Sequence, residues 1–497
     1  MAKIYYNLIG GKYKPANSGK TYKNINPANT DDVIGLFPLS DETDVYEAVE
    51  AAKKAYEKWR KVPAPKRGEI IRRATEILIK RKEELARLMT REMGKVLKET
   101  RGDVQEAIDT GLYAAGEGRR LFSYTVPSEL PNKMGFVIRQ PMGVWGIITP
   151  WNFPMAIPSW KIFPAILCGN TVVFKPATYT PASAHEFVRA LVEAGLPDGV
   201  VNIVYGSGGA VGEAIINHPD ICGVSFTGSS EVGKRIAEVC GKTLKRCSLE
   251  LGGKNAQIVM DDADLELALD GVLWGAFGTT GQRCTATSRL ILHEKIYNKF
   301  LAMLKERTER LRVGDGLDEK TEVGPCVSEA QRETVHKYVQ IGLEEGAKLV
   351  CGGKPLTSGK YKKGYFYAPT IFADVKPQMR IAQEEIFGPV LSVIKVKSFD
   401  EAITVLNNTR YGLSSSIYTK NINLAMRAIE NIEAGITYVN APTIGAECHY
   451  PFGGVKETGN GHREGGWTVY DIFSELKTVY IDYSGSLQKA QIDTWKD

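Results

Sequence analysis

Two residues suited to covalent oxidation chemistry, Glu250 and Cys284, stand in segments rich in glycine and small polar side chains. Glu250 lies in the segment 248–254, and Cys284 lies in the segment 277–285. A thiolate attacks carbonyl carbons, and a carboxylate of raised pKa can activate water. Together the two groups suit oxidation of an aldehyde to an acid through a thioester. Taken singly, the cysteine could be a packed thiol and the glutamate a charged loop residue.

Apolar runs alternate with helical patterns in the middle of the chain, and these elements must position the two residues. The runs are 143–148, 171–174, 200–204 and 221–226. Such near-continuous strands, separated by helices, are typical of parallel βαβ units whose sheet is covered on both faces. Right-handed crossovers build them into an open, doubly wound sheet, which binds ligands at the carboxyl ends of its strands.

The same alternation begins again after Lys254 and predicts a second α/β domain. Its expected strands are 258–260, 290–292, 390–394 and 415–418, with helices at about 296–312, 328–345, 399–408 and 422–431. We expect an early helix of this domain to carry Cys284 at its N-terminal side. A helix N-terminus and a cationic neighbour such as Arg283 would lower the pKa of the thiol.

Length and composition narrow the class of protein. A chain of 497 residues is too long for one hydrophobic core, which predicts two or three domains. With 43% hydrophobic and 24% charged residues it resembles a soluble globular protein, and its formal net charge of +5 is scattered, which argues against nucleic-acid binding. No apolar stretch approaches the roughly 20 residues of a membrane span. The eight cysteines lack CxxC or zinc-ligand spacing, so we expect reduced thiols, a cytoplasmic location and no metal site.

Several further segments carry a resemblance to a known family. They are Trp151-Asn152-Phe153-Pro154, Phe174-Lys175-Pro176-Ala177, Phe226-Thr227-Gly228-Ser229, Glu384-Glu385-Ile386-Phe387-Gly388-Pro389 and Pro451-Phe452-Gly453-Gly454. Together with the segments of Glu250 and Cys284, they resemble in type and order those of the aldehyde dehydrogenase superfamily. The resemblance spans nearly the whole chain. It implies a Rossmann-like cofactor domain (1–122 and 143–252), a catalytic domain (253–471) and oligomerisation elements (123–142 and 472–497) of a homodimer or homotetramer.

The resemblance implies catalytic roles for three residues. Cys284 would attack the aldehyde, and the Asn152 amide with the Cys284 N–H would stabilise the oxyanion, at roughly 3–4 kcal/mol per donor. Glu250 would then activate the water that hydrolyses the thioester. Relatives that pass the acyl group to coenzyme A generally lack this glutamate, so a free carboxylic acid is the expected product. A non-catalytic binding protein and a thiol esterase are the alternatives from other classes of function.

The resemblance also implies a nicotinamide cofactor. The segment 228–233 resembles the family's Gly-Ser-x-x-x-Gly segment beside the pyrophosphate, at a helix start where free N–H groups favour phosphate. The glycine-rich segment 206–212 is one residue longer than G-x-G-x-x-G and is a weaker phosphate loop. Lys175 would contact the adenosine ribose, Glu385 the nicotinamide ribose, and Phe387 would pack near the nicotinamide. The implied cofactor residues are Ile148, Thr149, Pro150, Trp151, Lys175, Ala177, Thr178, Gly208, Gly212, Phe226, Thr227, Gly228, Ser229, Val232, Leu251, Gly252, Glu385 and Phe387.

Thr178 stands where NAD-specific relatives usually carry a glutamate that accepts from the ribose hydroxyls. Without that carboxylate a 2′-phosphate is not repelled, and Lys175 could pair with it. We therefore expect NADP to be accepted or preferred, with equal use of NAD and NADP as the alternative.

The resemblance implies a small-molecule aldehyde as substrate. The segment 281–289 favours an acidic one because it resembles the catalytic segment of bacterial 2-oxoglutarate semialdehyde dehydrogenases. A broad range of aliphatic or aromatic aldehydes is the alternative. Non-phosphorylating glyceraldehyde-3-phosphate dehydrogenases share Gln-Arg-Cys-Thr-Ala, but they favour tyrosine where this chain has Phe153. Arg283 could hold a carboxylate or phosphate, or be paired away from the pocket. The implied pocket residues are Phe153, Met155, Ile157, Trp160, Phe277, Arg283, Thr285, Ile444, Cys448, His449 and Phe452.

Overall fold

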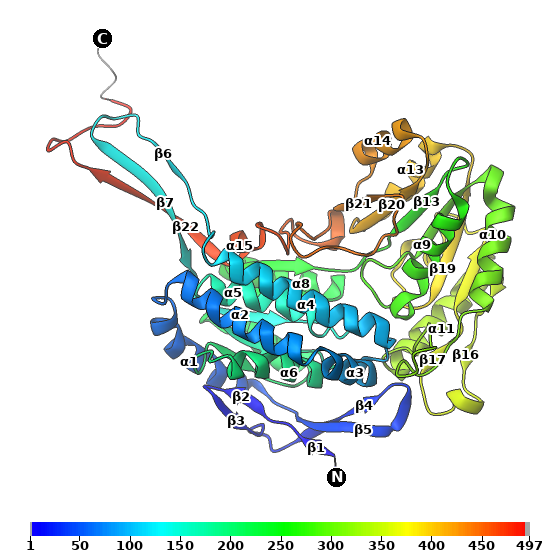
Figure 1. The fold of residues 1–497 in the computed structure, drawn as a ribbon, viewed down its shortest axis with the longest axis horizontal. Coiled ribbons are helices and arrows are strands. Elements are labelled where there is room, and N and C mark those ends of the chain that lie inside the picture. The colour runs from blue at the N-terminus through cyan, green and yellow to red at the C-terminus, as the bar shows by residue number, and fades with distance from the viewer. Residues whose placement is uncertain (1, 493–497) are drawn as a thin grey trace.

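Two seven-stranded sheets, each covered by helices, form the body of the protein (Figure 1). The structure, a computed structural model, describes residues 2–492. The first sheet has the strand order β12-β11-β8-β9-β10-β2-β3, in which β12 to β10 are parallel and β2 and β3 form an antiparallel edge. Its strands are β2 (Asn7–Ile9), β3 (Lys12–Lys14), β8 (Val144–Ile148), β9 (Thr171–Lys175), β10 (Val201–Ile203), β11 (Ile221–Thr227) and β12 (Arg246–Glu250).

Both faces of this sheet are buried, which explains why its strands are almost continuously apolar. Trp145 and Ile147 of β8 face one core with α2, α4, α5 and α6, while Val144 and Ile148 face another with α1, α7 and α8. The helices are α1 (Glu42–Trp59), α2 (Ala64–Lys80), α3 (Lys82–Met93), α4 (Leu97–Glu117), α5 (Ala156–Leu167), α6 (Pro181–Glu193), α7 (Glu213–Asn217) and α8 (Ser230–Thr243), with a π-helical turn η1 (Gly208–Gly212) before α7. The predicted doubly wound sheet is confirmed.

The second sheet has the order β15-β18-β19-β14-β13-β20-β21 and is parallel except at β15. Its strands are β13 (Ala256–Val259), β14 (Arg289–His293), β15 (Lys348–Cys351), β18 (Thr370–Ala373), β19 (Val390–Val396), β20 (Ser414–Tyr418) and β21 (Ile436–Val439). Around it lie α9 (Leu265–Phe277), α10 (Glu294–Glu309), α11 (Glu329–Glu344), α12 (Arg380–Gln383), α13 (Phe399–Asn407) and α14 (Ile422–Asn431). The second α/β unit is therefore also present where the apolar pattern resumed after Lys254.

One expectation about this unit is wrong, because Cys284 does not lie at the N-terminus of a helix. Helix α9 ends at Phe277, a short 3-10 turn η2 (Gly278–Gly281) follows, and Cys284 lies in a further turn before β14. Thr279 and Thr280 have φ of 52° and 58°, in the left-handed region, so the chain leaves the helix there. No helix dipole favours the thiolate at this position.

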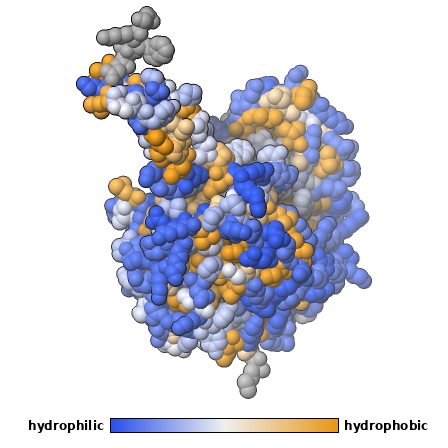
Figure 2. Space-filling model, turned by 60° about the vertical axis from the view of Figure 1, so that its left-hand side comes forward, coloured by the Kyte–Doolittle hydropathy of each residue, from blue (hydrophilic) through white to orange (hydrophobic). Residues whose placement is uncertain are grey.

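A three-stranded antiparallel sheet projects from the body as an arm (Figure 1). It consists of β6 (Thr125–Pro127), β7 (Lys133–Pro141) and β22 (Ser474–Asp482), in the order β22-β7-β6. The arm contains most of the two segments, 123–142 and 472–497, that were expected to serve oligomerisation. Residues 493–497 of that prediction lie outside the described residues. Figure 2 shows apolar side chains gathered on the arm, among them the exposed Val126, Met134, Leu476, Tyr480 and Ile481.

Small elements complete the fold. They are β1 (Lys3–Ile4), β4 (Thr21–Asn26), β5 (Asn29–Pro38), β16 (Pro355–Leu356), β17 (Phe366–Tyr367), α15 (Val469–Ile472), and the 3-10 turns η3 (Gly359–Tyr361) and η4 (Lys456–Thr458). Among residues 2–492, no helix is long and apolar enough to cross a membrane.

A fully buried ion pair ties the residues before α4 to α4 itself, and its carboxylate also binds the start of α5. Lys95 Nζ lies 2.7 Å from Asp103 Oδ2, and both side chains are 0% exposed. The other oxygen of Asp103 accepts the backbone N–H of Ala156 at 2.9 Å. Lys95→Met leaves a buried carboxylate without its cation, so we expect the free energy of unfolding to fall by about 3–5 kcal/mol. Urea unfolding measures this loss.

The matched control for that variant is Lys66→Met, which removes an exposed pair with Glu69. Exposed pairs contribute little because water and salt screen them. The control should unfold like the parent protein. Equal stability of K95M and K66M would contradict the importance of the buried pair.

Candidate active site

The parallel strands of the first sheet end together at one edge, and this edge gathers the residues predicted to bind cofactor. Ile148 pairs in register with Lys175 on one side and with Phe226 on the other. Thr227 pairs with Glu250 at the ends of β11 and β12. The carboxyl ends of parallel strands are where such sheets bind ligands.

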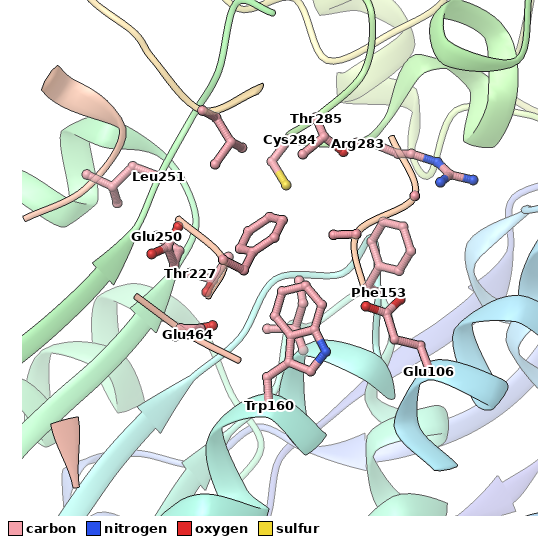
Figure 3. A pocket seen from close by; sticks show the side chains of 15 residues that line it. Glu106, Phe153, Trp160, Thr227, Glu250, Leu251, Arg283, Cys284, Thr285 and Glu464 are labelled. Atoms are coloured by element: carbon pink, nitrogen blue, oxygen red, sulfur yellow. The ribbon is translucent and has the colours of Figure 1, made fainter. Parts of the chain in front are cut away.

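Cys284 lies across a cavity from this edge. In Figure 3 the Cys284 sulfur points into the cavity, Glu250 and Glu464 lie on one side of it, and Phe153 and Glu106 lie on the other. The Cys284 carbonyl accepts the Asn255 side-chain amide at 2.7 Å. A side chain in place of Gly253 would put a Cβ 2.5 Å from that carbonyl, so this close approach requires glycine. These contacts hold the backbone of Cys284 in place.

Burial, together with the nearby carboxylates of Glu385 and Glu250, raises the pKa of the Cys284 thiol to about 12. This is opposite to the expectation from sequence, for two reasons. The helix N-terminus is missing, and the positive charge of Arg283 is paired with Glu99 at 2.9 Å. The free protein holds Cys284 as a thiol, so its proton must be removed as it attacks.

Glu250 is the carboxylate best placed to exchange protons in the cavity. Both of its oxygens are buried without a hydrogen-bond partner among residues 2–492. Burial raises the pKa of Glu250 well above its ordinary value, and the neighbouring carboxylate of Glu464 raises it further. Glu464 is itself ion-paired with Lys161, which also donates to Ser225 Oγ at 2.9 Å. Neither Glu464 nor Lys161 was predicted from the sequence, because they lie in distant segments and neither belongs to a recognisable motif.

Asn152 lies beside the turn that carries the nucleophile. Its side chain is 2% exposed, and its Nδ2 donates to the carbonyl of Gln282 at 3.2 Å. Gln282 is anchored in turn, because its Oε1 accepts the backbone N–H of Val327 at 2.9 Å. The Asn152 amide is therefore held close to the peptide that precedes Arg283 and Cys284.

The edge of the first sheet also offers groups that fit a dinucleotide. Ser229 caps α8 by accepting the N–H of Val232, which leaves the other N–H groups of the first turn for phosphate. Burial lowers the pKa of Lys175 to about 8, and its Nζ donates to the carbonyl of Pro176 at 3.1 Å. The buried hydroxyl of Thr227 has no partner within the described residues. These polar atoms are oriented for a ligand that the fold itself does not supply.

Glu385 and Phe387 close the site from the second sheet. Glu385 Oε1 accepts the N–H of Gly253 at 3.0 Å, and burial raises its pKa to about 7. Phe387, at φ 57°, packs its ring edge to face on Trp151 with centroids 5.3 Å apart. A Cβ added to Gly208 or Gly212 would meet no atom within 4 Å. The remaining predicted cofactor residues follow β8 (Thr149, Pro150), β9 (Ala177, Thr178), β11 (Gly228) and β12 (Leu251, Gly252). No cluster of metal-binding side chains occurs in the described chain.

Most predicted substrate residues face the cavity. Its walls include Phe153, Ile157, Trp160, Arg283, Thr285 and Phe452. Phe277 lines a wider groove that adjoins the cavity, and Met155 is buried in the core. Ile444 is buried at 3% exposed, and the next two residues, Gly445 and Ala446, line the cavity. Cys448 and His449 line neither space.

Glu106 of α4 was not predicted and lines both the cavity and the outer groove. Burial raises its pKa to about 8, with Asp103 adding to the effect. Its carboxyl makes no hydrogen bond or ion pair within residues 2–492. The local sequence gives no signal for Glu106, because only the packing of α4 brings its side chain to the cavity.

The chain is similar to known proteins over almost its whole length. Residues 13–479 match the aldehyde dehydrogenase family. This chain belongs to the aldehyde dehydrogenase family. It is 44% identical to the alpha-ketoglutaric semialdehyde dehydrogenase of Bacillus subtilis (96% of this chain, 98% of that protein) and 45% identical to the alpha-ketoglutarate semialdehyde dehydrogenase of Haloferax volcanii (96% and 99%). The crystal structure of an NAD-dependent aldehyde dehydrogenase from Sinorhizobium meliloti has a TM-score of 0.95 at 38% identity (98% and 96%). The protein is an NAD(P)-dependent aldehyde dehydrogenase.

Proposed function

We propose that this aldehyde dehydrogenase oxidises an acidic semialdehyde to the dicarboxylic acid with NADP or NAD. The observation that carries the proposal is a thiol and an unpartnered carboxyl, Cys284 and Glu250, facing one cavity at the cofactor edge. The substrate class is supported by relatives that are named for alpha-ketoglutarate semialdehyde. The product is a free acid because Glu250 is present to activate water.

The chemistry divides among three side chains. Cys284 gives its proton to water as Sγ bonds to the aldehyde carbon. The carbonyl electron pair moves to the oxygen, and the oxyanion that forms accepts from the Asn152 amide. Bound nicotinamide supplies the acceptor for the hydride that leaves this carbon. Glu250 then takes a proton from water, the hydroxyl adds to the thioester carbonyl, and Cys284 leaves as the acid is released.

The acid end of the substrate is proposed to lie toward Arg283 and Glu106. Arg283 uses two of the five guanidinium N–H groups, one to Glu99 and one to Thr279, so others remain for a carboxylate. Glu106, whose pKa burial raises to about 8, is protonated at pH 7. In that form it donates a hydrogen bond and does not repel the substrate.

The experiment is a panel of aldehydes of matched chain length, with and without a terminal carboxylate, followed by the absorbance of reduced nicotinamide. A kcat/KM at least about tenfold higher for the acidic members supports the proposal, since tenfold corresponds to one well-placed charged hydrogen bond. Equal rates across the panel would instead indicate a broad-range enzyme.

Thr178 is expected to permit NADP, which gives a direct prediction. Thr178→Glu places a carboxylate near the 2′-phosphate, so kcat/KM for NADP should fall on the order of tenfold or more. NAD, which lacks this phosphate, should be affected less than about threefold. Steady-state kinetics with both cofactors measure the change.

Thr178→Gln is the control, because it has the shape of glutamate without the charge. It should leave the ratio of NADP to NAD use close to that of the parent enzyme. Strict NAD dependence of the parent enzyme would contradict the assignment.

The same proposal covers assembly and location. The proposed cofactor domain comprises residues 1–122 and 143–252. The proposed catalytic domain comprises residues 253–471, and the oligomerisation elements comprise residues 123–142 and 472–497. The exposed apolar side chains of the arm support its use in a homodimer or homotetramer, because a large apolar surface is stabilised by burial. Reduced, unpaired thiols support a cytoplasmic location.

A further inference from the structure

The turn that precedes the nucleophile closes around one carboxylate, that of Glu99 in the first turn of α4. The backbone N–H of Thr279 lies 2.9 Å from Glu99 Oε1 and 2.8 Å from Oε2. Arg283 also donates to Oε1 at 2.9 Å, and its Nε donates to Thr279 Oγ1 at 2.9 Å. The two ends of the turn, Thr279 and Arg283, are thus bound to the same side chain.

This turn needs such a tie because its backbone is strained. Thr279 and Thr280 both have positive φ, a region that β-branched residues adopt only at an energetic cost. The Glu99 and Arg283 side chains are 10% and 12% exposed. Hydrogen bonds to an ionised carboxylate are strong in such a water-poor setting. The bonds to Glu99 therefore offset the strain of the left-handed conformation.

The turn sets the position of the groups that would react. Arg283 is bonded directly to Cys284, and its guanidinium lies 5.4 Å from the centre of the Phe153 ring. Phe153 follows Asn152, whose amide donates to the carbonyl of Gln282 within the same turn. A shift of the turn would move the thiol and the amide relative to each other.

We propose that Glu99 is a positioning residue for the nucleophile. Its carboxylate holds the turn from Thr279 to Arg283 so that Cys284 points into the cavity beside the Asn152 amide. The inference rests on the proposed role of Cys284. Glu99 lines the outer groove but not the cavity that holds the thiol, and it acts on Cys284 through the turn.

The test compares Glu99→Ala and Glu99→Gln with Glu83→Ala as the matched control. Glu83 is an exposed carboxylate that pairs with Arg87 and Arg101 on the surface. The alanine variant loses every bond to the turn, whereas glutamine keeps one acceptor oxygen for Thr279. We expect kcat per folded active site to fall about 100-fold for alanine and about tenfold for glutamine, with KM for the aldehyde within about threefold.

A second readout does not depend on turnover. Iodoacetamide alkylation of Cys284, followed by mass spectrometry across a pH series, reports the environment of the thiol in each variant. The proposal expects its rate and pH profile to change in the order alanine, glutamine, parent, and to stay unchanged in E83A. If the alanine variant does not fold, the glutamine variant carries the test because it keeps the size of the side chain.

The possible results distinguish the positioning role of Glu99 from the proposed dehydrogenase function. Parent-like kcat and alkylation in folded E99A and E99Q would overturn the positioning role while leaving the dehydrogenase chemistry intact. A loss of folded protein with unchanged kcat per folded site would also overturn it, since the role would then be structural. Parent enzyme that oxidises no aldehyde would instead count against the proposed function, whatever the state of Glu99.

Discussion

Replacing Cys284 with alanine is expected to abolish aldehyde-dependent reduction of the cofactor, with kcat falling on the order of 10⁴-fold or more. Among residues 2–492 no other thiol lines the cavity, so no other described residue there can form the thioester. The groups expected to bind cofactor belong to other strands and keep their places. Absorbance of reduced nicotinamide measures the rate, and equilibrium titration of the cofactor shows that the site remains intact.

Cys448→Ala is the matched control for this variant. Cys448 is half-buried, and burial raises its pKa to about 11, so it resembles Cys284 in chemistry but lies outside the cavity. Its removal should leave kcat close to that of the parent enzyme. A C284A variant that keeps a tenth of the parent rate would show that hydride transfer does not pass through this thiol.

The parallel strands could be predicted because their sequence pattern reflects their burial. In β8, Trp145 and Ile147 face one core while Val144 and Ile148 face the other, so the strand is apolar at every position. Once the strands are parallel, their carboxyl ends must share one edge. That rule alone places Lys175 near the end of the strand that carries Ile148, as the register confirms.

The turn before Cys284 could not be predicted, because its conformation opposes local preference. Threonine disfavours positive φ, yet Thr279 and Thr280 both adopt it. The bonds that stabilise it come from Glu99, far away in the sequence. The same reason explains why two cavity residues were not predicted. Glu106 and Glu464 are brought to the cavity by tertiary packing, and no sequence motif lies beside them.

The raised pKa of Glu250 predicts that kcat depends on pH. A base acts in its ionised form, and burial with Glu464 raises the pKa of Glu250 well above its ordinary value. The ionised fraction of Glu250 therefore grows as the pH increases through this raised pKa, and kcat should rise with it. The rise should disappear in Glu250→Gln, whereas Glu433→Gln, an exposed carboxylate paired with Lys456, should keep it.

The time course of Glu250→Gln should distinguish its two steps. Without a base for water, each active site is expected to release about one equivalent of reduced cofactor and then stall as the thioester on Cys284. Steady turnover should fall on the order of 10²–10⁴-fold. Rapid-mixing absorbance measures the burst, and mass spectrometry detects the acyl group on Cys284. Unimpaired turnover would mean that another group activates water, and Glu464 would be the next candidate, because it lines the same cavity and one of its oxygens has no partner among residues 2–492.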